Sequence, residues 1–157
     1  VRNDLRGQTG NDHISGLGEA DELRGRQGTD TIFGGDGGDS IQGGPHNDSI
    51  DGGAGTDVAN YGGAAAAVTV NLGAGTTSGA EGSDSLVSLE NILGSKFNDT
   101  LVGAATINAI IAGAGNDSLS GLGANDRLDG QAGTDSANGG DGTDVCLSAE
   151  TRVSCEG

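Results

Sequence analysis

The chain has 157 residues, enough for one domain, and contains 33 glycines, no tryptophan or methionine, and 23 acidic residues against 7 basic ones. A net charge of −16 argues against nucleic acid and anionic membrane surfaces as partners, because both repel an acidic chain. No apolar run approaches the roughly 18 residues of a membrane span, so we expect no membrane insertion.

Residues 1–60 are predicted to form a first repeat block, because from Gly7 onward they fall into nine-residue units. The units read GQTGNDHIS, GLGEADELR, GRQGTDTIF, GGDGGDSIQ, GGPHNDSID and GGAGTDVAN. Their sixth position is always aspartate, and the residues concerned are Asp12, Asp21, Asp30, Asp39, Asp48 and Asp57. Composition alone is equally compatible with a disordered linker. A random linker, however, does not hold one phase over six units.

The nine-residue period is interrupted in residues 61–93. The stretch 68–72 (VTVNL) alternates apolar and polar residues, which predicts a half-buried strand. Leu86, Leu89 and Ile92 recur at every third position, and this spacing does not distinguish a strand from a short helix. Because its apolar residues are patterned, we expect 61–93 to be an ordered insert that joins two blocks and packs on the solenoid.

Residues 94–147 resume the phase as a second block, and residues 148–157 are predicted to form a C-terminal cap. The units read GSKFNDTLV, GAATINAII, AGAGNDSLS, GLGANDRLD, GQAGTDSAN and GGDGTDVCL. Their sixth positions are Asp99, Asn108, Asp117, Asp126, Asp135 and Asp144. Residues 11–39 also align with 116–144 at an offset of 105, including an irregular GLG.

Each unit divides into a glycine-rich turn, GGxGxD, and a three-residue strand, xUx, in which U is aliphatic. Glycines allow the backbone to turn tightly and to aim carbonyl groups inward, and the strand directs one side chain inward. Two units make one flattened coil, and coils stack about 4.8 Å apart as parallel strands. The predicted fold is an all-β, right-handed parallel β-roll, a β-solenoid in two repeat blocks.

This stacking places the aspartates in columns along both edges of the roll. Two carboxylates about 5 Å apart repel by roughly 1 kcal/mol in water and by about 3 kcal/mol at an effective dielectric constant of 20. A divalent cation between turns reverses the sign, and carboxylate plus carbonyl oxygens favour calcium over magnesium, zinc or copper. With two inter-turn sites per edge in each block, we expect about eight calcium ions. Because few bulky residues point inward, we also expect the calcium-free chain to be largely unfolded.

The repeats closely resemble the RTX, or hemolysin-type, calcium-binding repeat GGxGxDxUx, over about 108 residues. The resemblance implies that turn carbonyls and the position-six aspartates bind calcium. These are Asp12, Asp21, Asp30, Asp39, Asp48, Asp57, Asp99, Asp117, Asp126, Asp135 and Asp144. Some turns depart from the pattern: GAATIN lacks the aspartate, and GSKFND carries Lys96 and Phe97.

Cys146 and Cys155, the two cysteines, lie close together in sequence, which fits an oxidising, extracytoplasmic setting. We predict a disulfide that pins the cap; a pair of free thiols is the alternative. We expect a secreted, monomeric, non-enzymatic protein or module that folds on binding calcium. The alternatives are an adhesion scaffold with a cell-surface or polysaccharide partner, and the C-terminal module of a larger secreted enzyme. Glycan-array binding would distinguish the adhesion scaffold from the other two hypotheses.

Overall fold

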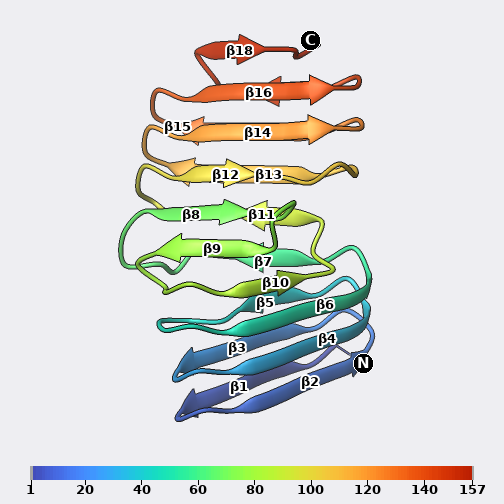
Figure 1. Ribbon diagram of the computed structural model, residues 1–157, viewed down its shortest axis with the longest axis vertical. Helices are drawn as coiled ribbons and strands as arrows, with labels where there is room; N and C mark the ends of the chain where they lie inside the picture. The colour runs from blue at the N-terminus through green and yellow to red at the C-terminus, as the bar shows by residue number, and fades with distance from the viewer. Residues whose placement is uncertain (1, 157) are drawn as a thin grey trace.

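The computed structural model describes residues 2–156, which form 18 β-strands in two sheets (Figure 1). Sheet A has the order β1 (Asp4–Thr9), β3 (Glu22–Gln27), β5 (Ser40–Gln42), β7 (Val58–Asn60), β11 (Asn91–Leu93), β13 (Ala109–Ala114), β15 (Arg127–Ala132), β17 (Val145–Leu147). Sheet B has the order β2 (His13–Gly18), β4 (Thr31–Gly37), β6 (Ser49–Gly55), β10 (Ser85–Val87), β9 (Thr76–Gly79), β8 (Val68–Asn71), β12 (Thr100–Val102), β14 (Ser118–Gly123), β16 (Ser136–Asp141), β18 (Thr151–Val153). In this part of the chain no helix is long and apolar enough to cross a membrane.

The chain alternates between the sheets, so that two nonapeptides make one coil. Leu5 pairs with Leu23 in sheet A, and Ile14 pairs with Ile32 in sheet B, each with a parallel register of eighteen residues. Figure 1 shows the coils stacked along the long axis, from β1 and β2 at one end to β18 at the other. The prediction of an all-β parallel β-roll is confirmed.

The core is the file of aliphatic side chains at position eight, enclosed between the two sheets. Successive residues of a strand point to opposite faces, so the central residue of xUx faces inward while its neighbours face outward. Leu23, Ile32, Ile110 and Leu128 are fully buried in this way. Each coil therefore contributes two side chains to a narrow core, which leaves the edges to be held by polar groups.

Residues 61–93 extend both sheets. In sheet A, β11 pairs with β7 on one side and with β13 on the other. In sheet B, β8 and β9 form an antiparallel hairpin, and β10 pairs in parallel with β6. The predicted strand over 68–72 is β8. Leu86 and Ile92 lie on two strands, with Leu89 in the turn between them, so the three-residue spacing reflects two strands and not a helix.

The C-terminal end of the roll is closed by β18, which pairs with β16. A disulfide joins Cys146 to Cys155, whose Cα atoms are 5.7 Å apart, so the predicted bridge is confirmed and the free-thiol alternative is wrong. In the chain-entropy model a closed loop of this size contributes about 2.7 kcal/mol to stability.

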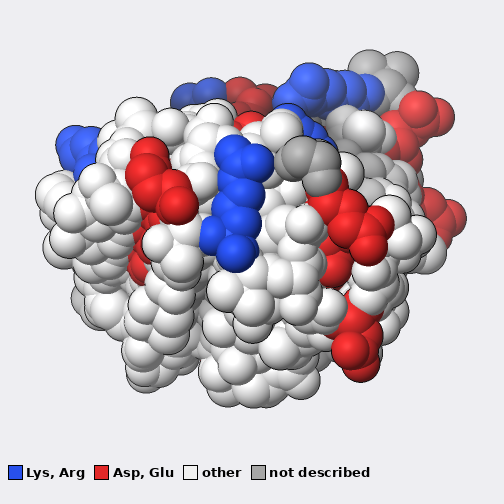
Figure 2. All heavy atoms as spheres, turned by 90° about the horizontal axis from the view of Figure 1, so that it is seen from above, with Lys and Arg blue, Asp and Glu red and all other residues white. Residues whose placement is uncertain are grey.

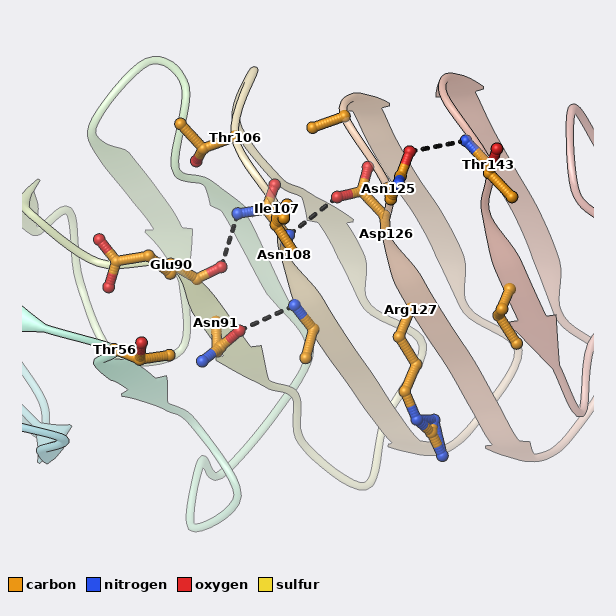
Figure 3. A pocket seen from close by; sticks show the side chains of 13 residues that line it. Thr56, Glu90, Asn91, Thr106, Ile107, Asn108, Asn125, Asp126, Arg127 and Thr143 are labelled. Carbon is orange, nitrogen blue, oxygen red and sulfur yellow. Dashed lines mark hydrogen bonds between the residues drawn. The ribbon is translucent and has the colours of Figure 1, made fainter.

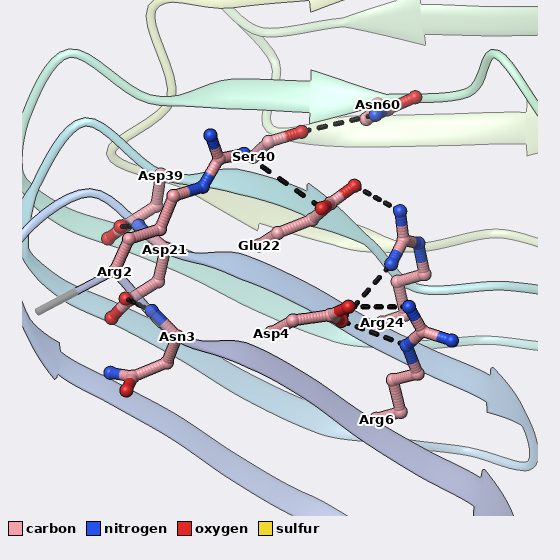
Figure 4. A network of polar contacts seen from close by, with 10 residues as sticks. All are labelled: Arg2, Asn3, Asp4, Arg6, Asp21, Glu22, Arg24, Asp39, Ser40 and Asn60. Carbon is pink, nitrogen blue, oxygen red and sulfur yellow. Dashed lines mark hydrogen bonds and ion pairs between the residues drawn. The ribbon is translucent and has the colours of Figure 1, made fainter.

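The outer surface carries less charge than the composition suggests. Seen from the β18 end in Figure 2, most of the surface is uncharged. On β1 and β3, Arg6 and Arg24 form ion pairs with Asp4, and Arg24 also pairs with Glu22 (Figure 4). Many remaining acidic residues are buried aspartates of the repeat turns, so the unbalanced charge is concentrated along the edges of the roll.

Candidate metal centre

Every position-six aspartate lies in a turn between the sheets. We call the two lines of turns the A-to-B edge, where the chain leaves sheet A, and the B-to-A edge, where it returns. Between successive nonapeptide turns, the backbone N–H of an aspartate donates to the Oδ1 of the aspartate one coil later; for example, Asp21 donates to Asp39 over 2.7 Å (Figure 4), and Asp30 to Asp48 over 2.8 Å. This hydrogen bond fixes each carboxylate against the neighbouring turn and builds the predicted columns.

The second carboxylate oxygen of these aspartates is buried and lacks a hydrogen-bond partner among the described residues. This holds for the Oδ2 atoms of Asp12, Asp21, Asp30, Asp39, Asp48, Asp57, Asp117, Asp126, Asp135 and Asp144. Buried polar atoms are nearly always paired, and a series of ten in identical positions indicates a missing common partner. A carboxylate oxygen carries negative charge, so a cation is a partner that fits this position.

A carbonyl oxygen of the next coil lies beside the Oδ2 atom at most of these positions. A Cβ atom added to Gly34 would lie 2.5 Å from Asp39 Oδ2 and 2.3 Å from the Gly52 carbonyl oxygen. The glycine is required because these two oxygens converge on its Cα. Eight of the ten aspartates with an unpartnered Oδ2 share this arrangement: Asp12, Asp21, Asp30, Asp39, Asp57, Asp126, Asp135 and Asp144.

The donor set fits calcium. Within residues 2–156, no group of three or more His, Cys, Asp or Glu side chains converges on one point, so backbone carbonyls must complete any site. Carboxylate and carbonyl oxygens are the ligands that calcium accepts in flexible geometry. When bound, calcium would supply the positive charge that the buried oxygens lack.

Burial raises the pKa of several column carboxyls, because the charged form loses hydration in the turns. The pKa values of Asp39, Asp57, Asp117 and Asp126 are raised, and that of Asp48 rises to about 7. Without a metal ion, burial therefore favours the protonated form of these carboxyl groups, whereas a bound metal ion would favour the ionised form.

This shift predicts a pH dependence for the calcium-free chain. The folded state holds the Asp48 proton more tightly than the unfolded state does. Protonation therefore stabilises the fold fully below about pH 4, and this contribution is lost as the pH rises through about 7. In a chelator, β-structure measured by circular dichroism should increase from pH 8 to pH 4. Asp48→Asn, which does not titrate, should weaken the dependence, and β-structure that grew with rising pH would contradict it.

The column on the A-to-B edge contains an aspartate that the repeat phase does not reveal. Asp84, in the turn before β10, accepts the backbone N–H of Asp48 over 3.0 Å, as a position-six aspartate would. Its Oδ2 accepts the Tyr61 hydroxyl over 3.0 Å, and its own N–H donates to Thr77 Oγ1. The signal in the sequence is GSDSLV, residues 82–87, which matches the GxDxUx half of a unit. At this position a tyrosine hydroxyl pairs with the oxygen that has no partner in most of the repeat turns.

Two further turns have protein partners in place of an open carboxylate. Asp99 Oδ2 accepts the backbone N–H of Ser95 over 2.6 Å, so Asp99 differs from the other ten predicted aspartates. Asn108 donates its side-chain amide to the Glu90 carbonyl over 2.6 Å, in a pocket of about 870 Å³ on the B-to-A edge (Figure 3). The centre of the solenoid is thus joined by direct hydrogen bonds on both edges.

Tyr61→Phe is predicted to destabilise this centre. The substitution leaves the buried Asp84 Oδ2 without its donor, which typically costs about 1–3 kcal/mol. Denaturant unfolding at saturating calcium measures this loss, and the number of bound calcium ions should not change. A variant as stable as the parent, or one that loses calcium, would show that this hydrogen bond has a different role.

Parallel coils with carboxylates and carbonyls facing each other along both edges define the class of calcium-binding β-rolls. The family model described as the RTX calcium-binding nonapeptide repeat (4 copies) matches residues 2–32, 24–59, 90–119 and 111–146. The chain belongs to this family, so calcium binding in a β-roll follows from its membership. No curated protein matches the chain.

Proposed function

We propose that the chain is a secreted, non-enzymatic β-roll whose fold depends on calcium bound between successive turns. The ligands are the position-six carboxylates and the turn carbonyls, at about eight sites. The observation that carries this proposal is the row of buried Oδ2 atoms without partners, most of them beside a carbonyl oxygen of the next coil.

The setting is outside the cell, and two observations support it. The Cys146–Cys155 disulfide is compatible with an oxidising compartment. A chain whose columns repel without calcium can be exported unfolded and then fold where calcium is abundant, because a ligand that binds only the folded state stabilises it by mass action.

Calcium titration followed by isothermal calorimetry and native mass spectrometry tests the proposal. We expect several calcium ions per monomeric chain, and magnesium at the same concentration should not replace them because it favours octahedral geometry and retains its water. A chain that binds no calcium when calcium is in excess would refute the proposal. Glycan-array binding would favour an adhesive role instead.

A further inference from the structure

Three tripeptides of the form Ser-x-Glu follow strands of the roll directly. They are Ser88–Glu90 after β10, Ser148–Glu150 after β17, and Ser154–Glu156 after β18. The first leads from sheet B to β11 in sheet A, and the second leads from sheet A to β18 in sheet B. Each therefore occupies the place of a GGxGxD turn with three residues instead of six.

The three tripeptides have the same backbone and packing. Ser88, Ser148 and Ser154 have φ angles of 51°, 48° and 48°, in the left-handed region that allows a tight turn. The middle residues are Leu89, Ala149 and Cys155. The first two are buried, and Cys155 packs against the core through its disulfide. The short turn thus contributes its own side chain to the core.

The glutamate replaces the next aspartate of the column. The backbone N–H of Glu90 donates to the Asp57 carbonyl, and the Oε2 of Glu90 accepts the Asp57 N–H over 2.9 Å. Glu150 makes the same pair of bonds to Asp135, with its Oε2 2.6 Å from the Asp135 nitrogen. The longer glutamate side chain compensates for the shorter turn.

The serine carbonyl replaces the carbonyl of the missing position-one glycine. A Cβ atom added to Gly52 would meet the Ser88 carbonyl oxygen and Asp57 Oδ2. The equivalent pairs are Ser148 O with Asp135 Oδ2 at Gly130, and Ser154 O with Asp144 Oδ2 at Gly139. The three Oδ2 atoms are buried and unpartnered, and their residues are at most 2% exposed. These are three of the eight aspartates that face a carbonyl oxygen of the next coil.

We propose that the Ser-x-Glu tripeptides are closing turns, which complete a calcium site where the next coil has a shortened turn, with a serine carbonyl and the charge of a glutamate. They allow Asp57, Asp135 and Asp144 to bind calcium although the next coil offers a three-residue turn in place of GGxGxD. This inference rests on the proposed calcium function and adds ligand groups that the nonapeptide pattern does not contain.

Glu90→Gln and Glu150→Gln test the closing turns. Glutamine retains an oxygen that can accept the aspartate N–H, so the substitution removes charge and keeps the hydrogen bond. Calcium per chain, counted by native mass spectrometry, should fall by one in each variant, or one site should weaken at least about tenfold by calorimetry, which corresponds to about 1.4 kcal/mol. The matched control is Glu22→Gln, on the outer face of β3, which should keep the parent stoichiometry.

The outcomes separate this inference from the proposed function. If the parent chain binds calcium and both glutamine variants bind the same number of ions with the same affinities, the closing-turn inference is wrong and the proposed function stands. Loss of all sites together would also overturn it, because the role assigned to each glutamate is local. A parent chain that binds no calcium would overturn the proposed function itself.

Discussion

In a chelator at neutral pH, the two repeat blocks should lose most of their β-structure and regain it when calcium is added. Ten buried carboxylate oxygens lack a partner in the metal-free turns. Each unpaired buried polar group costs about 1–3 kcal/mol. The net stability of a domain is only about 5–15 kcal/mol, so the metal-free columns can outweigh it.

Far-UV circular dichroism in EGTA, followed by titration with calcium, measures this transition. The fluorescence of Tyr61, the single tyrosine in a chain without tryptophan, reports on the centre of the roll, where its hydroxyl donates to Asp84. The thermal midpoint should rise with calcium concentration, because calcium binds the folded state. An unchanged, β-rich spectrum in EGTA would refute calcium-dependent folding, and a titration with magnesium serves as the control.

Gly34→Ala should destabilise the calcium-loaded protein strongly. The added Cβ would lie 2.3 Å from the Gly52 carbonyl oxygen, a backbone atom that cannot move without shifting the next coil, and 2.5 Å from Asp39 Oδ2. Overpacking of this kind costs about 3 kcal/mol at the upper end of its usual range. The methyl group also occupies the space that the metal site requires, so one calcium ion should be lost as well.

Gly18→Ala is the matched control, because its Cβ would have its nearest neighbour at 3.9 Å, an ordinary contact. Denaturant unfolding at saturating calcium should separate the two alanine variants clearly, and native mass spectrometry should show the lost ion in Gly34→Ala alone. Equal stability of both variants would mean that the space beside Asp39 is not the calcium site.

Much of the fold and of the candidate site could be predicted from the repeat. A nine-residue period places every second aspartate in one column, because two units make one coil and parallel strands keep the register. The aliphatic residue at position eight is inward for the same reason. The two cysteines near the C-terminus were also sufficient to predict the disulfide that closes the roll.

The groups that interrupt and end the columns could not be predicted in this way. Asp84 accepts the Asp48 N–H across 36 residues of sequence, and Glu90 accepts the Asp57 N–H across 33. A period detects only turns of constant length, whereas these contacts depend on where the chain returns after a hairpin or a shortened turn. Asp99 illustrates the converse, because its position in the repeat is regular while Ser95 already occupies its Oδ2.

The sequence by itself determined the repeating coil and its columns of aspartates, because both depend on contacts that recur at a fixed spacing, and its two cysteines determined the bridge. Only the tertiary structure decided which carboxylates remain open to a cation and which are paired with Tyr61, Ser95 or another protein group. That difference arises because pairing requires two groups to meet in space, and residues 61–93 bring together groups whose separation follows no period.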